Sequence, residues 1–434
     1  MTRLLRMKLI FYLAIFFSAP TLLFAEGTVN TADTAWMMMA TGLVMLMIPG
    51  LALFYGGMVR SNNVLSAVMH SLFAMGVMSI QWYVIGYSLS WGSDTGFGLV
   101  GGFEYMFLNG VGLEAKGSIP HVLFMMFQGM FAIITPALIA GAVVERIKFS
   151  SWVIFMVLWG TFVYDPLCHM VWHTDGFLLK RGGLDFAGGL VVHISSGVSA
   201  LVLAIIIGKR ISYGKMPMPP HNLVITVIGA ALLWFGWFGF NAGSALASNE
   251  LSANALVVTH LSAASGLFAW VIAEWIYIKT PSILGAASGL VAGLVAITPG
   301  SGFVTPTSAV IIGLTGGFIC FLGVRIKSRF GFDDSLDAFG VHGIGGIVGA
   351  LLTGIFATKL INPDGANGIF YVFLEGSELL FEQAISIAFT IIYATILTVI
   401  IAKLIDKTMG LRVSSDIEIQ GLDGTLHGEQ AYHN

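Results

Sequence analysis

Long apolar stretches separated by short polar segments run through most of this chain. Eleven of them are long enough to cross a bilayer as helices, because a span needs about 20 mainly apolar residues. They lie near 36–57, 64–90, 121–142, 151–168, 186–208, 221–240, 253–277, 282–299, 303–324, 339–360 and 380–404. The pattern predicts an all-α polytopic membrane protein with eleven transmembrane helices.

Composition agrees with this class. The 434 residues are 56% hydrophobic and only 10% charged, whereas soluble domains are about 25% charged. The net charge of -3 and the lack of a basic run give no indication of a nucleic-acid partner. Cys168 and Cys320 fit neither a disulfide framework nor a metal-ligand spacing. We therefore expect no metal and no cofactor.

The first 25 residues have the features of a secretory signal peptide. Arg3, Arg6 and Lys8 form a basic start, residues 9–17 an apolar core, and Ala25 ends near a plausible cleavage site. An uncleaved first helix is the alternative. Cleavage would leave the new N-terminus outside the cell membrane.

Basic residues indicate the orientation, because loops rich in Lys and Arg stay in the cytoplasm. With the N-terminus outside, thirteen of them fall inside: Arg60, Arg146, Lys148, Lys209, Arg210, Lys215, Lys279, Arg325, Lys327, Arg329, Lys403, Lys407 and Arg412. Four fall outside: Lys116, Lys180, Arg181 and Lys359. The bias predicts a multi-pass protein of the cell (inner) membrane with a cytoplasmic C-terminus.

Eleven spans divide naturally into five, five and one. An odd number per repeat forces the second copy to enter the membrane upside down, which gives an inverted repeat. We expect residues 33–208 and 221–360 to form the two halves, 380–408 the eleventh span and 409–434 a cytoplasmic tail.

Two histidines fall at equivalent places in these halves, His193 on the fifth span and His342 on the tenth. Each of the two helices opens with an aspartate, Asp185 and Asp337. Helical rise puts His193 about 12 Å below Asp185. Ionisable groups at membrane depth tend to mark a substrate or proton path. Neutral imidazoles suit a small, polar, uncharged permeant or a proton relay, although packing alone is the alternative.

Several other residues are candidates for a functional site, but the sequence alone allows more than one role for each. Asp185 could bind a cation, cap its helix or support a site through its charge. Trp172 lies just beyond the fourth span, as a membrane-interface residue or as a face for a cation. The aromatic and glycine cluster 234–244 could be core packing or a constriction with a polar ledge at Ser244. Phe127 and Phe131 share one helix face, for which core packing is the simplest explanation.

Four motifs in order resemble the ammonium transporters (the Amt/Mep/Rh family), most closely the bacterial Amt type. They are Asp185-Phe-Ala-Gly-Gly-Leu-Val-Val-His193, Gly236-Trp-Phe-Gly-Phe-Asn-Ala-Gly-Ser244, Asp337-Ala-Phe-Gly-Val-His-Gly343, and the tail Gly421-Leu-Asp with His427-Gly-Glu and Ala431-Tyr432. The similarity runs from about Asp33 to the C-terminus. The chain departs from the family at His173, where glycine is usual.

The resemblance implies a homotrimer with one pore in each eleven-helix subunit. The resemblance also implies that Trp172, Phe131 and Ser244 form an external site that recruits ammonium. Asp185 would support this site. By the same resemblance, Phe131 and Phe240 form a stacked gate below it.

The resemblance also implies that His193 and His342 line the pore with coupled rings. A bare cation entering an apolar tube would lose hydration worth on the order of tens of kcal/mol. Only ammonium can leave a proton behind and cross as ammonia, so such a pore selects by chemistry rather than by size. The residues leave open whether the proton follows through the imidazoles.

Two other classes of function remain at this point. One is an ammonium sensor that acts through a cytoplasmic PII-type partner docked on the tail, Lys209, Arg210 and Lys215. The other is an ion pump or membrane enzyme, which would need a further buried carboxylate near the histidines. Glu274 lies too close to the inner end of the seventh span for that role, and we expect no enzyme.

Overall fold

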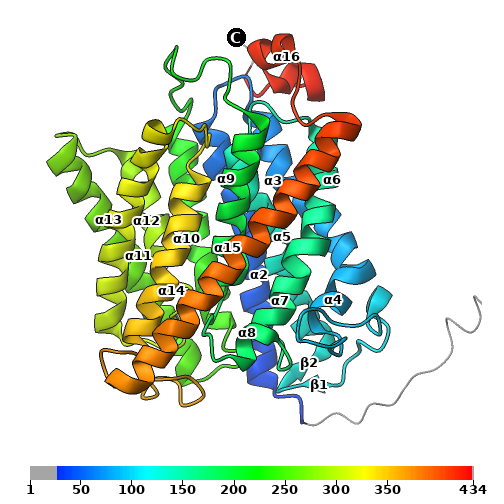
Figure 1. Cartoon of the computed structure of the whole chain (residues 1–434), viewed down its shortest axis with the longest axis vertical. Coiled ribbons are helices and arrows are strands. Elements are labelled where there is room, and N and C mark those ends of the chain that lie inside the picture. Colours follow the sequence, from blue (N-terminus) through cyan, green and yellow to red (C-terminus); the bar gives the residue numbers. More distant parts are fainter. Residues whose placement is uncertain (1–26, 433–434) are drawn as a thin grey trace, which may run out of the picture.

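The computed structural model describes residues 27–432. The expected signal peptide, 1–25, lies outside the described residues and stays a prediction. Long helices run side by side between two ends of the molecule (Figure 1). The first half contains α2 (Thr31–Met58), α3 (Val64–Gln81), η1 (Trp82–Gly86), α4 (Tyr87–Trp91), η2 (Met106–Leu108), α5 (His121–Val143), α6 (Phe149–Trp159), η3 (Gly160–Tyr164), α7 (Asp165–Trp172), α8 (Phe177–Lys180), η4 (Gly189–Ile194) and α9 (Ser195–Ile207).

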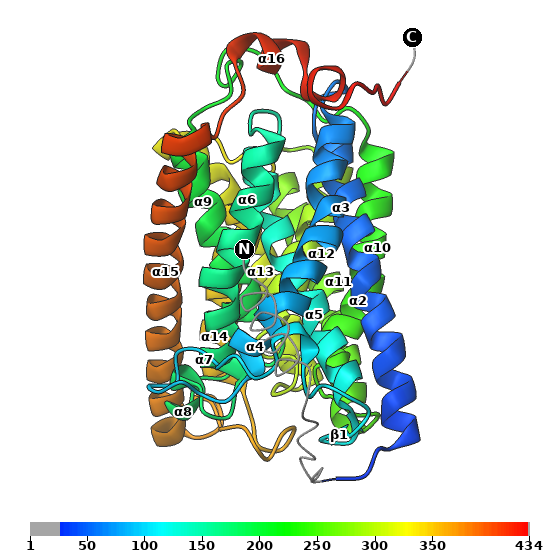
Figure 2. The ribbon, with the colours of Figure 1, turned by 90° about the vertical axis from the view of Figure 1, so that its right-hand side faces the viewer.

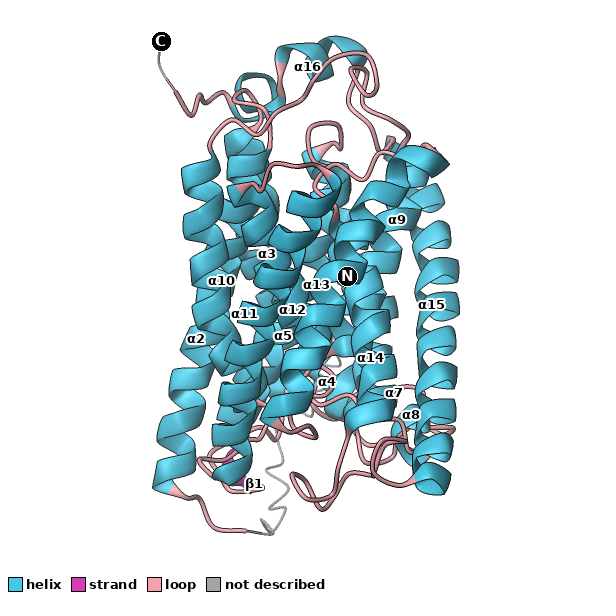
Figure 3. Cartoon of the chain, turned by 90° about the vertical axis from the view of Figure 1, so that its left-hand side faces the viewer, coloured by secondary structure: helices cyan, strands magenta, loops and turns pink. Residues whose placement is uncertain are grey.

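The second half repeats this plan. It contains α10 (Leu223–Gly243), α11 (Glu250–Tyr277), α12 (Ile283–Ile297), α13 (Pro306–Phe330), η5 (Phe339–Gly343) and α14 (Ile344–Phe356), followed by α15 (Phe373–Met409), α16 (Ser415–Gln420) and η6 (Asp423–His427). Figure 3 shows that helices form the body of the molecule, that loops lie at both of its ends, and that a strand, β1, lies at the end away from α16. There the short strands β1 (Ala115–Lys116) and β2 (Ile119–Pro120) form an antiparallel pair.

The eleven predicted spans are confirmed as helices. Within the described residues, ten helices are long and apolar enough to cross a membrane. The eleventh, α12, has 15 residues, which span about 22 Å and so fall short of a full bilayer core. It is buried along one face by α11 and α13, and glycines allow this close approach. A Cβ on Gly293 would lie 2.2 Å from the carbonyl oxygen of Ser262.

Several boundaries differ from the prediction, and in two of them capping or helix propensity extends the helix beyond its apolar part. α2 begins at Thr31 rather than near residue 36, since the side chain of Asn30 accepts hydrogen bonds from two N–H groups of its first turn. α15 runs from Phe373 to Met409 rather than over 380–404, and it crosses the bundle obliquely (Figure 1).

The two halves form the expected inverted repeat. Each histidine lies in a short π-helix, η4 or η5, that leads into an α-helix of 13 residues, α9 or α14. η4 packs against α14 while η5 packs against α9, so the two helices cross in opposite directions. Their backbones touch at the crossing, where a Cβ on Gly197 would lie 2.1 Å from the nitrogen of Gly343.

One end of the bundle carries the C-terminal tail and a buried network of charges, opposite the β1–β2 end (Figure 2). Arg210 donates two bonds of 2.9 Å to the carboxylate of Asp333 and one of 2.7 Å to Glu145. Glu145 also accepts from Arg60. The Arg210 side chain is only 8% exposed, so the expectation that it belongs to an exposed docking surface was wrong.

The tail is fixed to this same end by specific bonds. The Asp423 carboxylate accepts from the backbone nitrogens of Leu65 and Ser66 at the start of α3. The Glu418 carboxylate pairs with Arg412 and accepts from the nitrogen of Ile211. The tail therefore joins the loop after α2 to the loop after α9.

Candidate conduction site

The two predicted histidines face each other across the pseudosymmetry axis. Nδ1 of His193 lies 3.3 Å from Nδ1 of His342, and the rings stack with centroids 5.3 Å apart and planes at 19°. Both residues are buried. Their matching places in the repeat follow from the sequence, whereas their contact follows from the antiparallel crossing of η4 and η5.

The contact fixes a complementary pair of tautomers when both rings are neutral. One Nδ1 must donate and the other accept, so one ring carries its proton on Nδ1 and the other on Nε2. The pair therefore presents one bare Nε2 and one Nε2–H to its surroundings. Nε2 of His193 has no hydrogen-bond partner among the described residues, so it can bond a small polar molecule.

A narrow apolar cavity of about 10 Å³ lies at the two rings, the lower limit of the space that one water molecule needs. Its wall is lined by Met47, Leu51, Phe54, Ile134, Leu138, Val192, Leu233, Trp237, Phe240 and Val291 besides the histidines. An ion with its hydration shell does not fit this space.

A series of aromatic rings connects the histidines to the tryptophan beyond the fourth span. Phe240 lies 6.0 Å from the ring of His193. Phe131 packs against Phe240 with centroids 4.3 Å apart, and the two ring planes are tilted by 35° rather than stacked. Trp172 meets Phe131 edge to face at 5.8 Å. These four rings form a continuous column from Trp172 to His193.

Trp172 and Ser244 each donate one hydrogen bond to a backbone oxygen. The indole Nε1 of Trp172 donates a 2.8 Å bond to the backbone oxygen of Asp185, which fixes the ring on the protein. The Ser244 hydroxyl donates to the backbone oxygen of Phe240 at 2.8 Å, so its lone pairs are free to accept. Ser244 follows Gly243, which packs on the ring of Phe127.

The carboxylate of Asp185 is used fully by its own helix. Oδ1 accepts from the nitrogens of Gly188 and Gly189 at 2.8 and 2.6 Å, and Oδ2 from those of Leu190 and Val191 at 2.7 and 3.2 Å. Of the roles left open by the sequence, this geometry is that of a helix cap. The charge sits at the positive end of the helix dipole.

In the second half the cap is Asp334 rather than Asp337. The Asp334 carboxylate accepts from the nitrogens of Ala338 and Phe339 at 3.1 and 2.8 Å. Asp337 instead forms an ion pair with Lys327 and has a φ of 62°. The expectation that Asp337 matches Asp185 was therefore wrong.

Two carboxylates within the fourth and seventh spans are buried although the sequence did not predict this. Asp165 is fully buried in the fourth span and accepts a 2.6 Å bond from Nε2 of Gln81. A lone acid within an apolar stretch was the available signal. Glu274 is also buried and accepts from both the nitrogen and the hydroxyl of Ser282, which joins α11 to the start of α12.

Comparison with known proteins gives one consistent result. A model of the Ammonium Transporter Family matches residues 35–432. The chain is 49% identical over 406 residues to an ammonium transporter of Bacillus subtilis (strain 168), covering 93% of this chain and 98% of that protein.

Solved structures agree. A crystal structure of Candida albicans Mep2 matches with a TM-score of 0.84 at 35% identity, over 89% of this chain and 87% of that one. A structure described as a sensor Amt protein matches with a TM-score of 0.85 at 29% identity, over 91% and 98% of the two chains.

Proposed function

Because the chain belongs to the Ammonium Transporter Family, we propose that it moves ammonium across a cell membrane by passing ammonia between His193 and His342. The observation that carries this proposal is the histidine pair, with an unpartnered Nε2, inside an apolar cavity that fits one small molecule. The protein acts as a transporter and catalyses no covalent change in its substrate.

Recruitment takes place at the outer mouth. The face of Trp172 attracts the cation, an interaction worth about 0.5–2 kcal/mol. The hydroxyl of Ser244 accepts one ammonium N–H, because its own hydrogen is already donated to Phe240. Asp185 acts indirectly, since its backbone oxygen holds the Trp172 ring and its carboxylate fixes the start of η4.

Selection occurs below the Phe131–Phe240 gate. Transferring an intact ion into the apolar cavity costs far more than transferring a neutral molecule. Ammonium can give a proton to water at the outer mouth before it passes the gate as ammonia, whereas potassium has no proton to lose. Ammonia then accepts a hydrogen bond from the protonated Nε2 of one imidazole and donates to the bare Nε2 of the other. The coupled Nδ1 atoms provide a route by which a proton could pass between the rings.

The further expectations on topology and assembly form part of the same proposal. The N-terminus lies outside the inner membrane, the C-terminus lies in the cytoplasm, and three subunits assemble with one pore each. The thirteen-to-four distribution of basic residues supports this orientation. A sensory role through a PII-type partner is a second candidate, favoured by the docked tail and by the likeness to a sensor Amt protein.

Flux and current measured together on the full chain in liposomes test this function. We expect saturable uptake of ammonium with no potassium flux, and loss of uptake in a His193→Ala, His342→Ala double variant. The control is His260→Ala, which changes an exposed histidine of α11 that stacks on Trp234. Ammonium binding without any flux would show a pure sensor, and uptake unchanged in the double variant would contradict the pore.

A further inference from the structure

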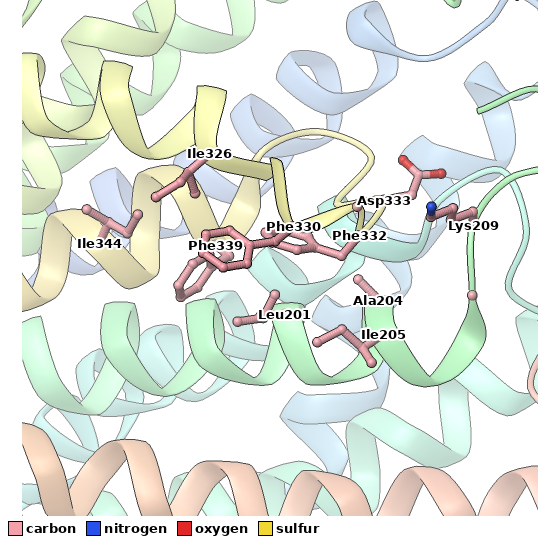
Figure 4. A pocket seen from close by; sticks show the side chains of 12 residues that line it. Leu201, Ala204, Ile205, Lys209, Ile326, Phe330, Phe332, Asp333, Phe339 and Ile344 are labelled. Carbon is pink, nitrogen blue, oxygen red and sulfur yellow. The ribbon is translucent and has the colours of Figure 1, made fainter. Parts of the chain in front are cut away.

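Outside the conduction path, lysine ammonium groups contact aromatic rings at both ends of the bundle. Figure 4 shows Lys209 at the edge of a cavity of about 760 Å³, at the end that carries the tail. Its ammonium lies 5.7 Å from one ring, that of Tyr213. Lys116, on β1 at the opposite end, contacts three rings at once. The second arrangement surrounds a cation, as the aromatic cages that bind ammonium ligands do.

The three rings form a cage around Nζ of Lys116. The ammonium lies 5.0 Å from the centroid of Phe124, 5.7 Å from that of Trp91 and 5.8 Å from that of Tyr105. Trp91 and Phe124 meet edge to face at 4.7 Å, which fixes two of the walls. Phe124 is buried, whereas Lys116, Trp91 and Tyr105 are partly exposed. The cage is therefore closed towards the helices and open towards the surface.

The charge of Lys116 is held by these rings rather than by a carboxylate. Among the described residues, no Asp or Glu oxygen lies at ion-pair distance from its Nζ. The carboxylates of the same loop region are bound elsewhere, because Glu104 accepts from the nitrogen of Ser93 and Glu114 pairs with His121 at 3.0 Å. Burial lowers the pKa of Lys116 to about 8, so the side chain still carries its proton at pH 7.

The cage lies next to the proposed recruitment site. Phe124 precedes Phe131 by seven residues on the same face of α5, about 10 Å along the helix. The ring of Trp91 lies 6.4 Å from that of His173, the neighbour of Trp172 in the chain. An ion that approaches the recruitment site therefore comes within the field of the caged ammonium.

The β1–β2 hairpin tethers Lys116 beside the cage. Its two strands are joined by a two-residue turn that begins at Gly117, whose φ of 65° suits such turns. The backbone oxygen of Ser118 accepts a 2.8 Å bond from the nitrogen of Asn30, which ties the turn to the start of α2. A tethered group competes at a local concentration on the order of millimolar, so dilute external cations do not displace it.

We propose that Trp91, Tyr105 and Phe124 form a second binding site for small ammonium cations, and that Lys116 occupies it as a built-in competitor. The faces of the rings attract any cation of this kind. The resident charge in turn repels ammonium on its way to Trp172, so the outer mouth binds its substrate less tightly than its aromatic rings allow. The effect on uptake rests on the transport function proposed above, whereas the binding site does not.

Saturation-transfer NMR on the purified full chain tests the cage, with tetramethylammonium as the probe at pH 7. This cation has no proton to lose, so its binding is measured apart from conduction. We expect Lys116→Ala to increase the bound fraction severalfold, because the rings become free. Lys116→Arg should keep the level of the unchanged protein, because the guanidinium refills the cage. Adding Trp91→Leu to Lys116→Ala should remove the gain.

A matched variant controls for the loss of a lysine charge. Lys359→Ala removes a lysine that pairs with Glu375 in the second half of the chain, and it should leave tetramethylammonium binding unchanged. Thermal unfolding shows whether each variant is folded, and Tyr105→Leu replaces Trp91→Leu if the latter is not. The proposal would be overturned by no gain in Lys116→Ala, by an equal gain in Lys359→Ala or Lys116→Arg, or by a gain that survives the loss of a cage ring.

Methylammonium uptake in liposomes tests the consequence for transport. Two unit charges about 10 Å apart, in a dielectric constant between about 80 and about 20, change an affinity roughly 2- to 15-fold. We therefore expect Lys116→Ala to lower the half-saturating concentration by this factor at low salt, and by less at high salt. Lys116→Arg should keep the original value.

The two measurements separate this inference from the transport function. Uptake with an unchanged half-saturating concentration in Lys116→Ala would show that Lys116 is no competitor, although the protein transports. Absence of uptake in every variant and in the unchanged protein, with the gain in tetramethylammonium binding intact, would contradict the transport function and leave the cage as a cation site.

Discussion

Asp185 and Asp334 hold the two halves of the site in the same way. Each lies eight residues before a buried histidine, and each accepts backbone N–H groups from the helix that carries this histidine. Replacing Asp334 with Ala should therefore lower stability by about 0.5–2 kcal/mol, as loss of a helix cap does, and should reduce ammonium flux by loosening His342.

Asp337 provides the comparison, because it stands closer to η5 in the sequence but pairs with Lys327 and does not cap the helix. Asp337→Asn should keep most of the flux, since asparagine tolerates the positive φ of this position. Thermal unfolding and uptake are measured on both variants. Equal losses for Asp334→Ala and Asp337→Asn would mean that the cap does not position His342.

Replacing His193 with Asp should make the pore conduct potassium. A carboxylate at this depth lowers the cost of carrying an intact cation, because opposite charges attract strongly where the dielectric constant is low. The leak should increase as pH rises and the new carboxyl group ionises. Potassium-driven current in liposomes measures this, and a variant that still excludes potassium at every pH would contradict it.

Replacing His342 with Ala should instead reduce ammonium flux. With only the imidazole of His193 left, the permeant would lack one hydrogen bond. This costs about 1–3 kcal/mol. Uptake at saturating ammonium measures the effect. If this variant transported at the normal rate, the two histidines would be packing groups.

Replacing Trp172 with Leu should weaken ammonium recruitment. Loss of a cation–π contact of about 0.5–2 kcal/mol corresponds to a rise of roughly 2- to 30-fold in the half-saturating concentration. Trp172→Phe is the matched control, because it also loses the bond to the oxygen of Asp185 but retains an aromatic face. Concentration dependence of methylammonium uptake distinguishes them. If the Trp172→Leu variant and the unchanged protein gave the same uptake curve, Trp172 would be a membrane-interface residue with no role in recruitment.

Lys116 should react selectively with amine reagents near pH 8. Burial among Trp91, Tyr105 and Phe124 lowers its pKa to about 8. About half of its amine is then neutral at that pH, against under about 1% for an ordinary lysine. The unfolded chain holds this proton up to about pH 10, so this residue adds stability as pH rises from about 8 to 10. Acetylation followed by mass spectrometry measures the rate at which Lys116 is modified, with detergent-denatured protein as the control. If Lys116 of the folded protein is labelled no faster than in that control, the prediction is wrong.

A PII-type partner should bind through the tail and the exposed lysines beside it. Lys209 and Lys215 are exposed, whereas Arg210 is held inside the protein by Asp333 and Glu145. Charge reversal of Lys215 together with deletion of 411–434 should abolish a pull-down of such a partner. Arg210→Gln should instead break the network of buried charges and lower the free energy of unfolding by about 3–5 kcal/mol. Unchanged capture after the first set of changes would dismiss this surface.

Hydropathy was enough to predict the spans, because each apolar run must cross the membrane as a helix. The equivalence of His193 and His342 also followed from the order of the spans. Their contact did not, since counting residues along each helix places His342 nearer the inner surface than His193. Only the crossing of η4 and η5 brings the two rings to one depth.

The missed features share one cause, which is that they depend on partners far away in the sequence. The sequence places Arg210 among the basic residues of the inside loops, and it does not reveal that Glu145 and Asp333, in two other loops, bind its side chain. Asp337 stands next to its helix in the sequence, whereas Asp334 reaches the N–H groups of that helix after the chain turns at a positive φ. Gln81 and Asp165 likewise meet only after the second and fourth spans pack together.

The π-helices give this fold an unusual sensitivity to insertions and deletions. Within the described chain, four of them lie in spans: η1 and η3 interrupt a helix, whereas η4 and η5 begin one. A π-turn contains one residue more than an α-turn, and one residue turns a helix by about 100°. Removing a single residue from 189–194 would restore regular winding and rotate the His193 imidazole away from its partner, while α9 kept its packing. The number of residues in the segment 189–194, and not only their identity, therefore determines where the His193 imidazole lies.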